Sequence, residues 1–333
     1  MSKKARRRSK NGEHMTESRQ SVAQTLEEVI TRRPALASIL KGLEPLLTVQ
    51  EGLVPELTIQ LAKAQIELPE VSPQRFSQGV SLFSTYGFEN LASPIRKSAS
   101  VLIPMLTSFP AVAPFKDELE TLLGAVSGEE PDGIRLQDLL RAFAAQDDTS
   151  VKKAAENAGI APPVLSFALS FIFSPLLRAL RKRIQGEAAV TPWDENDTWQ
   201  QGYCPVCGAL PSIAWLERPS NDPRNPYLTS GGGKKHLHCG ICGADWRFHR
   251  GKCPACGAEG DKLVEILREK TRSFGERIDW CTKCRAYCPT VDMRERETTP
   301  NLDALALGMF HLDMIASKKG LKPLRTTFWN TFS

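Results

Sequence analysis

CPVCG at residues 204–208, CGICG at 239–243, CPACG at 253–257 and CTKC at 281–284 decide the fold that this sequence predicts. Each stretch places two cysteines on one tight turn, here called a knuckle, so that both sulfurs can face a single ion. Two knuckles complete a tetrahedral shell of four sulfurs, and four knuckles therefore predict two metal sites. Redox dithiols and disulfides share this spacing, but four pairs within about 80 residues favour metal binding.

The residues between the knuckles indicate how the eight cysteines divide. A strand pattern from Ile213 to Leu216 and a second around His236 to His238 separate the first two knuckles, and a similar hairpin pattern separates the other two. The predicted metal ligands are Cys204, Cys207, Cys239 and Cys242 for the first site and Cys253, Cys256, Cys281 and Cys284 for the second. Interleaved pairing is the alternative, and it would require Cys204 to reach past a whole hairpin.

Glycine follows three of the knuckles, at Gly208, Gly243 and Gly257, where a positive φ would let the turn close. A bound ion replaces the large core that a module of about 40 residues lacks. Four thiolates fill the coordination shell and leave no position for a reactive water, so the sites are structural or electron-active rather than hydrolytic.

Cys288 is the ninth cysteine, and the pairing leaves it outside both sites as a buried free thiol. Three histidines, His236, His238 and His249, flank the second knuckle in strand patterns, where an ordinary half-buried histidine is the default. We therefore expect none of these four residues to be a ligand.

Apolar residues at helical spacing predict a helical domain from Ser21 to about Gly186, in which Ser72 and Pro73 open one helix that runs through Phe76, Val80 and Phe83. Apolar residues that include Leu165, Leu176 and Ile184 mark one face of a long helix. We interpret the basic run near its end, at Arg178, Arg181, Lys182 and Arg183, as charges that suit the helix dipole. Between Met15 and Gln200 there is no histidine, no cysteine and no nucleotide-binding glycine motif, so no catalytic group or small-molecule substrate is evident.

The connection from Glu187 to Tyr203 contains Trp193 and Trp199, which predict a linker packed against the domains. One last helix from Thr298 to Gly320 has Thr299 as its cap and Pro300 at its first position. The fold class is α+β: an all-helical N-terminal domain followed by two tandem rubredoxin-like or zinc-ribbon modules and a C-terminal helix. The domains are a disordered basic leader (1–20), a helical domain (21–200), a first metal module (201–249), a second (250–297) and a C-terminal helix and tail (298–333).

Composition narrows the class of protein. The chain has 333 residues, 41% hydrophobic and 24% charged, which suits a soluble globular protein of two or three domains. No cysteine precedes residue 204, so the thiols serve a local site in a reducing cytoplasm. The apolar run from Ile160 to Leu177 contains three prolines and three serines and predicts a buried core helix, with no stable membrane insertion.

Charge argues against nucleic acid as the partner. The net charge of +5 depends on six lysines and arginines in the first ten residues. From Cys204 to Cys288 there are 14 Lys or Arg and nine Asp or Glu, an excess of five that two ions in four-thiolate shells reduce to +1 for Zn²⁺ or +3 for Fe³⁺. That is a small charge for phosphate binding.

The residues alone are compatible with three classes of protein. These are a zinc-ribbon nucleic-acid-binding protein, a rubredoxin-like electron carrier, and an interaction or chaperone protein that uses the ribbons to bind a partner.

The ordered motifs resemble one family. CPVCG followed by Leu210 and Pro211, LHCGICGADWRFHRGKCPACG at 237–257, WCTKC at 280–284 and the helix from Leu302 to Ile315 look like the formate dehydrogenase accessory protein (FdhE) family. The resemblance extends upstream to the predicted helix from Ser166 to Ile184. The sequence differs from the usual pattern in its basic leader, in the insert from Pro219 to Gly233 and at Asn301 to Asp303.

The resemblance implies a cytoplasmic, non-enzymatic maturation factor that binds the catalytic subunit of formate dehydrogenase. It implies that the eight paired cysteines hold two metal ions, with iron favoured, although the spacing suits zinc as well. It supplies no catalytic residue.

Overall fold

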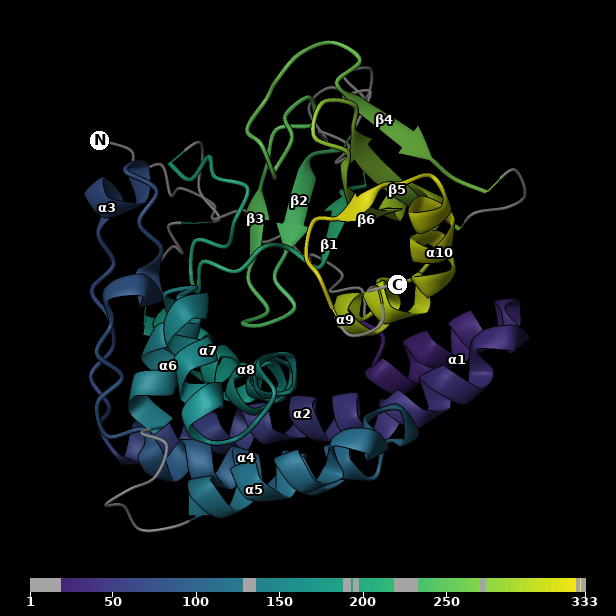
Figure 1. Cartoon of the computed structure of the whole chain (residues 1–333). Helices are drawn as coiled ribbons and strands as arrows, with labels where there is room; N and C mark the ends of the chain where they lie inside the picture. Colours follow the sequence, from purple (N-terminus) through teal and green to yellow (C-terminus); the bar gives the residue numbers. More distant parts are fainter. Residues whose placement is uncertain are drawn as a thin grey trace, which may run out of the picture.

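A helical region and a sheet region pack against each other in the computed structural model of the chain (Figure 1). The structure describes residues 19–127, 136–187, 193, 198–218, 233–269, 274–327 and 330. The predicted leader, up to residue 18, and residues 219–232 of the predicted insert lie outside this range.

The helical region contains eight α-helices in its described residues. They are α1 (Val22–Arg32), α2 (Ala37–Lys63), α3 (Pro73–Ser77), α4 (Ala92–Thr107), α5 (Lys116–Ser127), α6 (Leu136–Ala144), α7 (Asp148–Asn157) and α8 (Pro162–Glu187). Short 3-10 turns η1 (Pro34–Leu36), η2 (Leu82–Thr85) and η3 (Pro110–Phe115) connect some of them. The helical class predicted for this part of the chain is confirmed.

Side-chain caps start several of these helices. The Ser21 hydroxyl and the Gln24 side chain form a capping box at α1, and the Ser72 hydroxyl accepts from Arg75 N at α3, with Pro73 in the first position as predicted. The predicted continuation of α3 to Phe83 is wrong. The helix stops at Ser77, and Gly79 (φ +77°) turns the chain toward η2.

Helix α8 is the central element of the helical region and packs on α2, α4, α5 and α7. The predicted apolar face, with Leu165, Leu176 and Ile184 among its members, is buried. Phe173 and Leu177 are buried as well, so the helix is enclosed on more than one side. A segment of α8 from Pro162 to Gly186 is long and apolar enough to cross a membrane, but 72% of its most apolar window is buried inside the protein. That burial agrees with the predicted core helix.

The sheet region contains seven strands in one sheet, counted over the described residues. The strands are β1 (Ile213–Leu216), β2 (Lys235–His238), β3 (Asp245–Arg247), β4 (Val264–Leu267), β5 (Glu276–Cys281), β6 (Ala286–Asp292) and β7 (Lys322–Pro323). Their order is β3-β2-β1-β6-β5-β4, with β7 paired to β6. The hairpins β1–β2 and β4–β5 are the two that the sequence predicts.

Strand β6 joins the two predicted modules and is absent from the sequence prediction. It pairs parallel with β1, where Ala214 lies opposite Thr290, and antiparallel with β5, where Ile278 lies opposite Pro289. The two modules therefore share one continuous sheet and are not separate units. Lys235 of β2 also reaches Asp279 of β5, with 2.8 Å between Nζ and Oδ2 in a buried ion pair.

The predicted C-terminal helix is present as two consecutive helices, α9 (Leu302–Gly308) and α10 (Phe310–Lys318), preceded by the turn η4 (Met293–Glu295). The predicted cap at Thr299 is wrong, because the Asn301 side chain accepts from the N–H groups of Asp303 and Ala304. Gly308 explains part of the packing: a Cβ there would lie 2.8 Å from Val29, so α9 and α1 approach closely.

The linker tryptophans are packed, as predicted. Trp193 and Trp199 are 3% and 5% exposed. The Trp199 ring makes edge contacts with Phe76 and Tyr203, and its N–H donates to Tyr203 O at 2.8 Å. The linker thus fastens the first knuckle region to the helical region.

A buried carboxyl group connects α10 to the sheet. Asp313 is 2% exposed, and the hydroxyl of Tyr287 in β6 donates to its Oδ1 at 2.7 Å. Burial raises the pKa of Asp313 to about 6, and the Tyr287 hydrogen bond offsets only part of that shift. Because the folded pKa lies above the unfolded value, the stability that this group contributes is present at low pH and is lost as pH rises through 6.

Replacing Asp313 by Asn should therefore raise the free energy of unfolding at pH 7.5 by up to about 3 kcal/mol, since the amide is neutral and its oxygen can still accept from Tyr287. The gain should disappear near pH 4, where the carboxyl group is protonated in the folded protein. Urea unfolding of both proteins at the two pH values measures it. A variant that loses stability equally at both pH values would contradict the assignment.

Candidate metal centres

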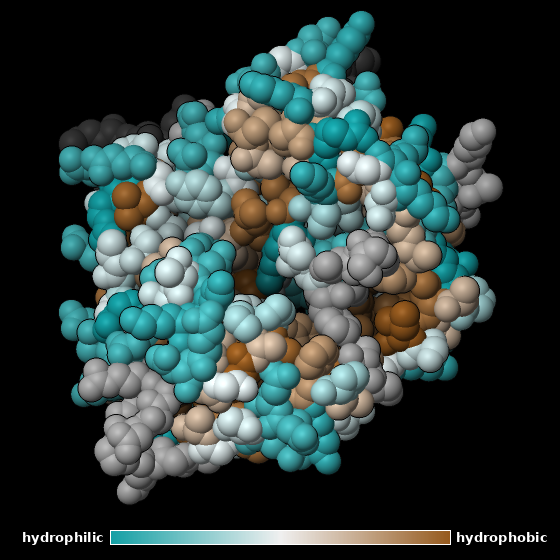
Figure 2. Space-filling model, in the orientation of Figure 1, coloured by the Kyte–Doolittle hydropathy of each residue, from teal (hydrophilic) through white to brown (hydrophobic). Residues whose placement is uncertain are grey.

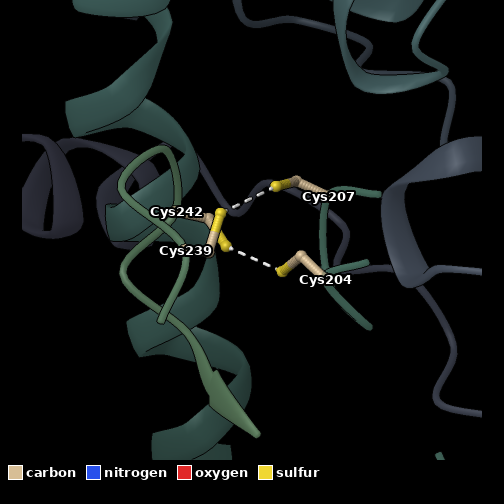
Figure 3. A group of neighbouring side chains, drawn as sticks. All are labelled: Cys204, Cys207, Cys239 and Cys242. Carbon is tan, nitrogen blue, oxygen red and sulfur yellow. Dashed lines mark hydrogen bonds between the residues drawn. The ribbon is translucent and has the colours of Figure 1, made fainter. Parts of the chain in front are cut away.

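Four sulfurs converge where the first two knuckles meet beside α8 (Figure 3). The Sγ atoms of Cys204 and Cys242 are 3.4 Å apart and those of Cys207 and Cys239 are 3.5 Å apart. A tetrahedral ion with bonds of about 2.3 Å to sulfur would hold its ligands about 3.8 Å apart. The four side chains are thus close to the spacing of a metal shell, and we call them the first centre.

The other knuckles form an equivalent group, the second centre. The Sγ atoms of Cys253 and Cys284 are 3.7 Å apart, and those of Cys256 and Cys281 are 3.9 Å apart. These separations are too long for disulfides, whose S–S bond is about 2.05 Å. The cysteines are grouped as the sequence predicts, and interleaved pairing is excluded. The two four-cysteine clusters could hold two metal ions, and the role of these cysteines as ligands stays a prediction.

The backbone of each knuckle closes in the same way. Gly208, Gly243 and Gly257 have φ of 75°, 69° and 68°, as predicted, and each donates its N–H to the carbonyl of the first cysteine of its knuckle. The fourth knuckle has Arg285 in that place, with φ of 62°. N–H groups also point at sulfur, as in Val206 N to Cys204 Sγ at 3.4 Å, an arrangement that stabilises a thiolate.

The helical region clamps the first knuckle through backbone hydrogen bonds. The N–H groups of Leu82 and Phe83, in η2, donate to the carbonyls of Pro205 and Val206, each at 2.8 Å. The first knuckle is therefore packed against the helical region and is not a surface loop.

Two arginines of α8 hold the second knuckle. Arg178 donates to Gly240 O at 2.8 Å and to Ile241 O at 3.2 Å, and Arg181 donates to Cys242 O at 2.8 Å. The Ser174 hydroxyl also donates to Ile241 O, at 2.7 Å. The interpretation of these arginines as charges for the helix dipole is wrong, because both lie well before the end of α8 and satisfy carbonyl groups of another region.

An ion-pair chain extends from Arg178 into the sheet. Its Nη1 lies 2.9 Å from Asp303 Oδ2, and His238 bridges Asp303 and Asp245 with distances of 3.2 and 3.0 Å. Burial alone would lower the pKa of His238, but the Asp245 and Asp303 carboxylates outweigh it and raise the pKa to about 9. Burial opposes ionisation of Asp303 too, yet Arg178 and His238 hold its pKa well below the usual value. His238 is thus a buried cation rather than a half-buried neutral group.

His236 is half-buried in β2, as expected, whereas the strand position predicted for His249 is wrong, because it lies after the end of β3 and is exposed. His236 stacks on Trp215 and lies 2.6 Å from Glu217, and His249 pairs with Glu259 on the surface. Cys288 is buried and free, outside both centres, as predicted. Burial raises the pKa of its thiol to about 12, so it stays protonated.

Sequence reasoning missed the residues that hold the first centre in place, namely Ser174, Arg178, Arg181 and Asp303. Their signal was the presence of Arg178 and Arg181 on the predicted core helix, since a charge inside a buried segment needs a partner. The partner itself could not be read from the sequence.

A cleft of about 690 Å³ lies beside the first centre, between α2, α6, α7, α8 and α9. Leu47, Phe143, Phe167 and Ile241 are among the apolar residues that line it, with Asp147 at its polar side. Figure 2 shows this face of the molecule hollowed near its middle, with hydrophobic residues gathered in the hollow. The junction of the two regions thus leaves an apolar cleft.

Replacing Arg178 by Met should lower the free energy of unfolding by about 3 kcal/mol, because it removes a buried cation from Asp303 and a donor from the Gly240 carbonyl. The matched control is Lys182→Met on the same helix, where the side chain is exposed and the change should stay within about 0.5 kcal/mol. Denaturant unfolding followed by circular dichroism measures both. Equal stabilities of the two variants would show that the Arg178 contacts are dispensable.

Comparison with known proteins identifies several relatives of one kind. No family model matches the chain. It is 26% identical over 171 residues to the protein FdhE homolog of Aquifex aeolicus, a match that covers 51% of this chain and 53% of that protein. It is 29% identical over 129 residues to the homolog of Shewanella baltica, or 38% of each protein. The chain thus matches about half or less of the length of these curated relatives.

The fold is also shared with a solved structure. The crystal structure of the FdhE protein from Pseudomonas aeruginosa aligns over 92% of this chain and 95% of that one, with a TM-score of 0.51 and 17% identity. That identity supports likeness of fold alone. The chain is thus similar to FdhE homologs over part of its length and shares its fold with a solved FdhE protein, in agreement with the resemblance that its motifs carry.

Proposed function

We propose that this chain is an accessory factor for the maturation of formate dehydrogenase, built on two metal ions that its eight paired cysteines hold. The observation that carries the proposal is the pair of four-cysteine clusters within a fold shared with an FdhE protein. The relatives that carry the FdhE name match this chain over part of their length.

The donor sets fit a thiophilic metal ion. Each centre offers four sulfurs within 4.8 Å of one another, and knuckle N–H groups that favour a thiolate point at sulfur in both centres. Ferrous, ferric and zinc ions all suit such a shell. Iron is the proposed ion because of the family resemblance, and zinc is the alternative. A bound ion would supply cross-linking of distant chain segments or one-electron chemistry.

The geometry favours a binding role over catalysis. Four thiolates complete each shell, so neither centre offers the open position of a hydrolytic metal site. Buried charged groups of the described residues pair with one another across the domain junction, as Arg178, Asp303 and His238 do. We therefore propose a scaffold that acts in the cytoplasm and recognises the immature catalytic subunit of formate dehydrogenase, with the apolar cleft beside the first centre as part of its surface.

The metal assignment is tested by purifying the protein without oxygen, counting its metal and recording its visible spectrum. We expect two ions per chain and, if the ion is ferric, strong absorption in the visible. Cys207→Ser should lose at least one ion, whereas Cys288→Ser should keep both, because Cys288 lies outside both clusters. Full metal content in Cys207→Ser would remove the assignment.

The maturation role is tested in cells that lack this gene. Formate dehydrogenase activity should be lost without the gene and return with the wild-type chain or with Cys288→Ser, while Cys207→Ser should fail to restore it. A tagged wild-type chain should co-purify with the catalytic subunit. Unchanged activity in the deletion strain would refute the proposal.

A further inference from the structure

The two centres differ in how well the protein covers their sulfurs. All four cysteines of the first centre are buried, with exposures of 0 to 1%. In the second centre Cys253 and Cys281 are buried, but Cys284 is half-buried and Cys256 is exposed. The second centre therefore leaves at least one of its cysteines exposed to the solvent.

The glycines of the knuckles show the same difference independently. A Cβ added at Gly208 would lie 3.3 Å from Ser81 Oγ, and one at Gly243 would lie 3.0 Å from Arg178 Nη1. Among the residues that the structure describes, a Cβ added at Gly257 would meet nothing within 4 Å. The helical region thus covers both knuckles of the first centre, whereas the third knuckle faces open space beside Cys256.

Opening the first centre would break contacts between regions. Its knuckles accept hydrogen bonds from Leu82, Phe83, Ser174, Arg178 and Arg181, all of them in the helical region. A sulfur can leave the ion there only if the knuckle moves, which would expose buried carbonyls and the charge of Asp303.

The third knuckle is held differently. Its described backbone bonds close within the module, from Cys253 N to Ala258 O and from Gly257 N to Cys253 O. On one side it rests on Gly202, where a Cβ would lie 2.0 Å from Pro254 O. Cys256 is exposed, so its side chain can swing toward solvent without disturbing that contact.

The fold around the second centre does not depend on these two knuckles alone. Strand β5 begins at Glu276, whose carboxylate lies 2.7 Å from Arg32 Nη1 and 2.8 Å from Arg33 Nη1 at the end of α1. The fourth knuckle is tied to the end of α10, where Arg285 donates to Lys319 O and Gly320 O. The shared sheet can therefore persist while the third knuckle opens.

The geometry points to a further function for the second centre: it exchanges its metal ion with external thiol ligands through Cys256, while the first centre keeps its ion as a permanent part of the domain junction. This inference rests on the metal binding proposed above. With an ion bound, an incoming thiol would replace Cys256 on the ion, the bond from the ion to Cys256 Sγ would break, and the freed Cys256 thiolate would take the proton that the incoming thiol gives up. The ion keeps its charge, and no electron is transferred.

Metal release from the wild-type chain tests the inference. The protein is reconstituted with Co²⁺, treated with excess glutathione or EDTA, and followed by native mass spectrometry. We expect a one-ion species to accumulate because one ion leaves at least about tenfold faster than the other, as local opening differs between the two sites. The helical circular dichroism signal should be unchanged at that stage.

Alkylation identifies the centre that has lost its ion. Iodoacetamide added at the one-ion stage should label Cys256 and Cys284 in the second centre and leave Cys207 and Cys239 in the first unlabelled. Cys256→Ser should lack the fast-leaving ion and keep the slow one. Cys207→Ser is the matched change in the first centre and should lose folded structure; if it does not fold, the labelling of the wild-type chain still decides the assignment.

Three results would count against the inference. Release of both ions at one rate, or earlier labelling of Cys207 and Cys239, would overturn the exchange function while leaving metal binding intact. A wild-type chain that takes up no metal would refute the metal assignment itself, together with the inference that depends on it.

Discussion

The contact between Arg178 of α8 and the second knuckle is the interaction on which the arrangement of the two regions depends. A guanidinium group in a buried segment must find acceptors, and the structure supplies two backbone carbonyls and the carboxylate of Asp303. One side chain thereby joins the core helix, the first centre and α9. The first centre is consequently an integral part of the protein interior, and the helical and sheet regions are one packed unit at that point.

A second set of buried charges joins the sheet to the end of α1, at the start of β5. Glu276, 1% exposed, lies within ion-pair distance of Arg32 in α1, of Arg33 at the C-cap of α1 and of Arg296 after η4. Removing one partner from such a cluster would leave an uncompensated buried charge. The loss in free energy of unfolding would then exceed the net stabilisation that any intact pair provides. These charges therefore restrict the way in which α1 can pack on the sheet, and they reach the second module at the start of β5 rather than at its knuckles.

The two centres illustrate how the same motif acquires different surroundings. Both consist of two knuckles joined by a hairpin, and their backbone turns are nearly identical in φ. The first is enclosed because η2 and α8 lie against it, whereas the second is at the rim of the sheet, where β4 has a single neighbour among the described strands. Spacing thus predicts the capacity for metal binding, and the neighbours decide whether the ion is accessible.

The sequence by itself determined the helical class of the first half, the buried face of α8, the two hairpins, the grouping of eight cysteines and the position of Cys288 outside both groups. These features are local, since helical periodicity and CxxC turns act over a few residues. Strand β6 could not be recognised, because Pro289 argues against a central strand and only its neighbours β1 and β5 stabilise it. The break between α9 and α10, the buried charge of His238 and the unequal cover of the two centres were decided by tertiary structure. Each depends on contacts between residues far apart in the chain, such as Gly308 with Val29 and Arg178 with Gly240, and no local pattern encodes which distant group a buried side chain will meet.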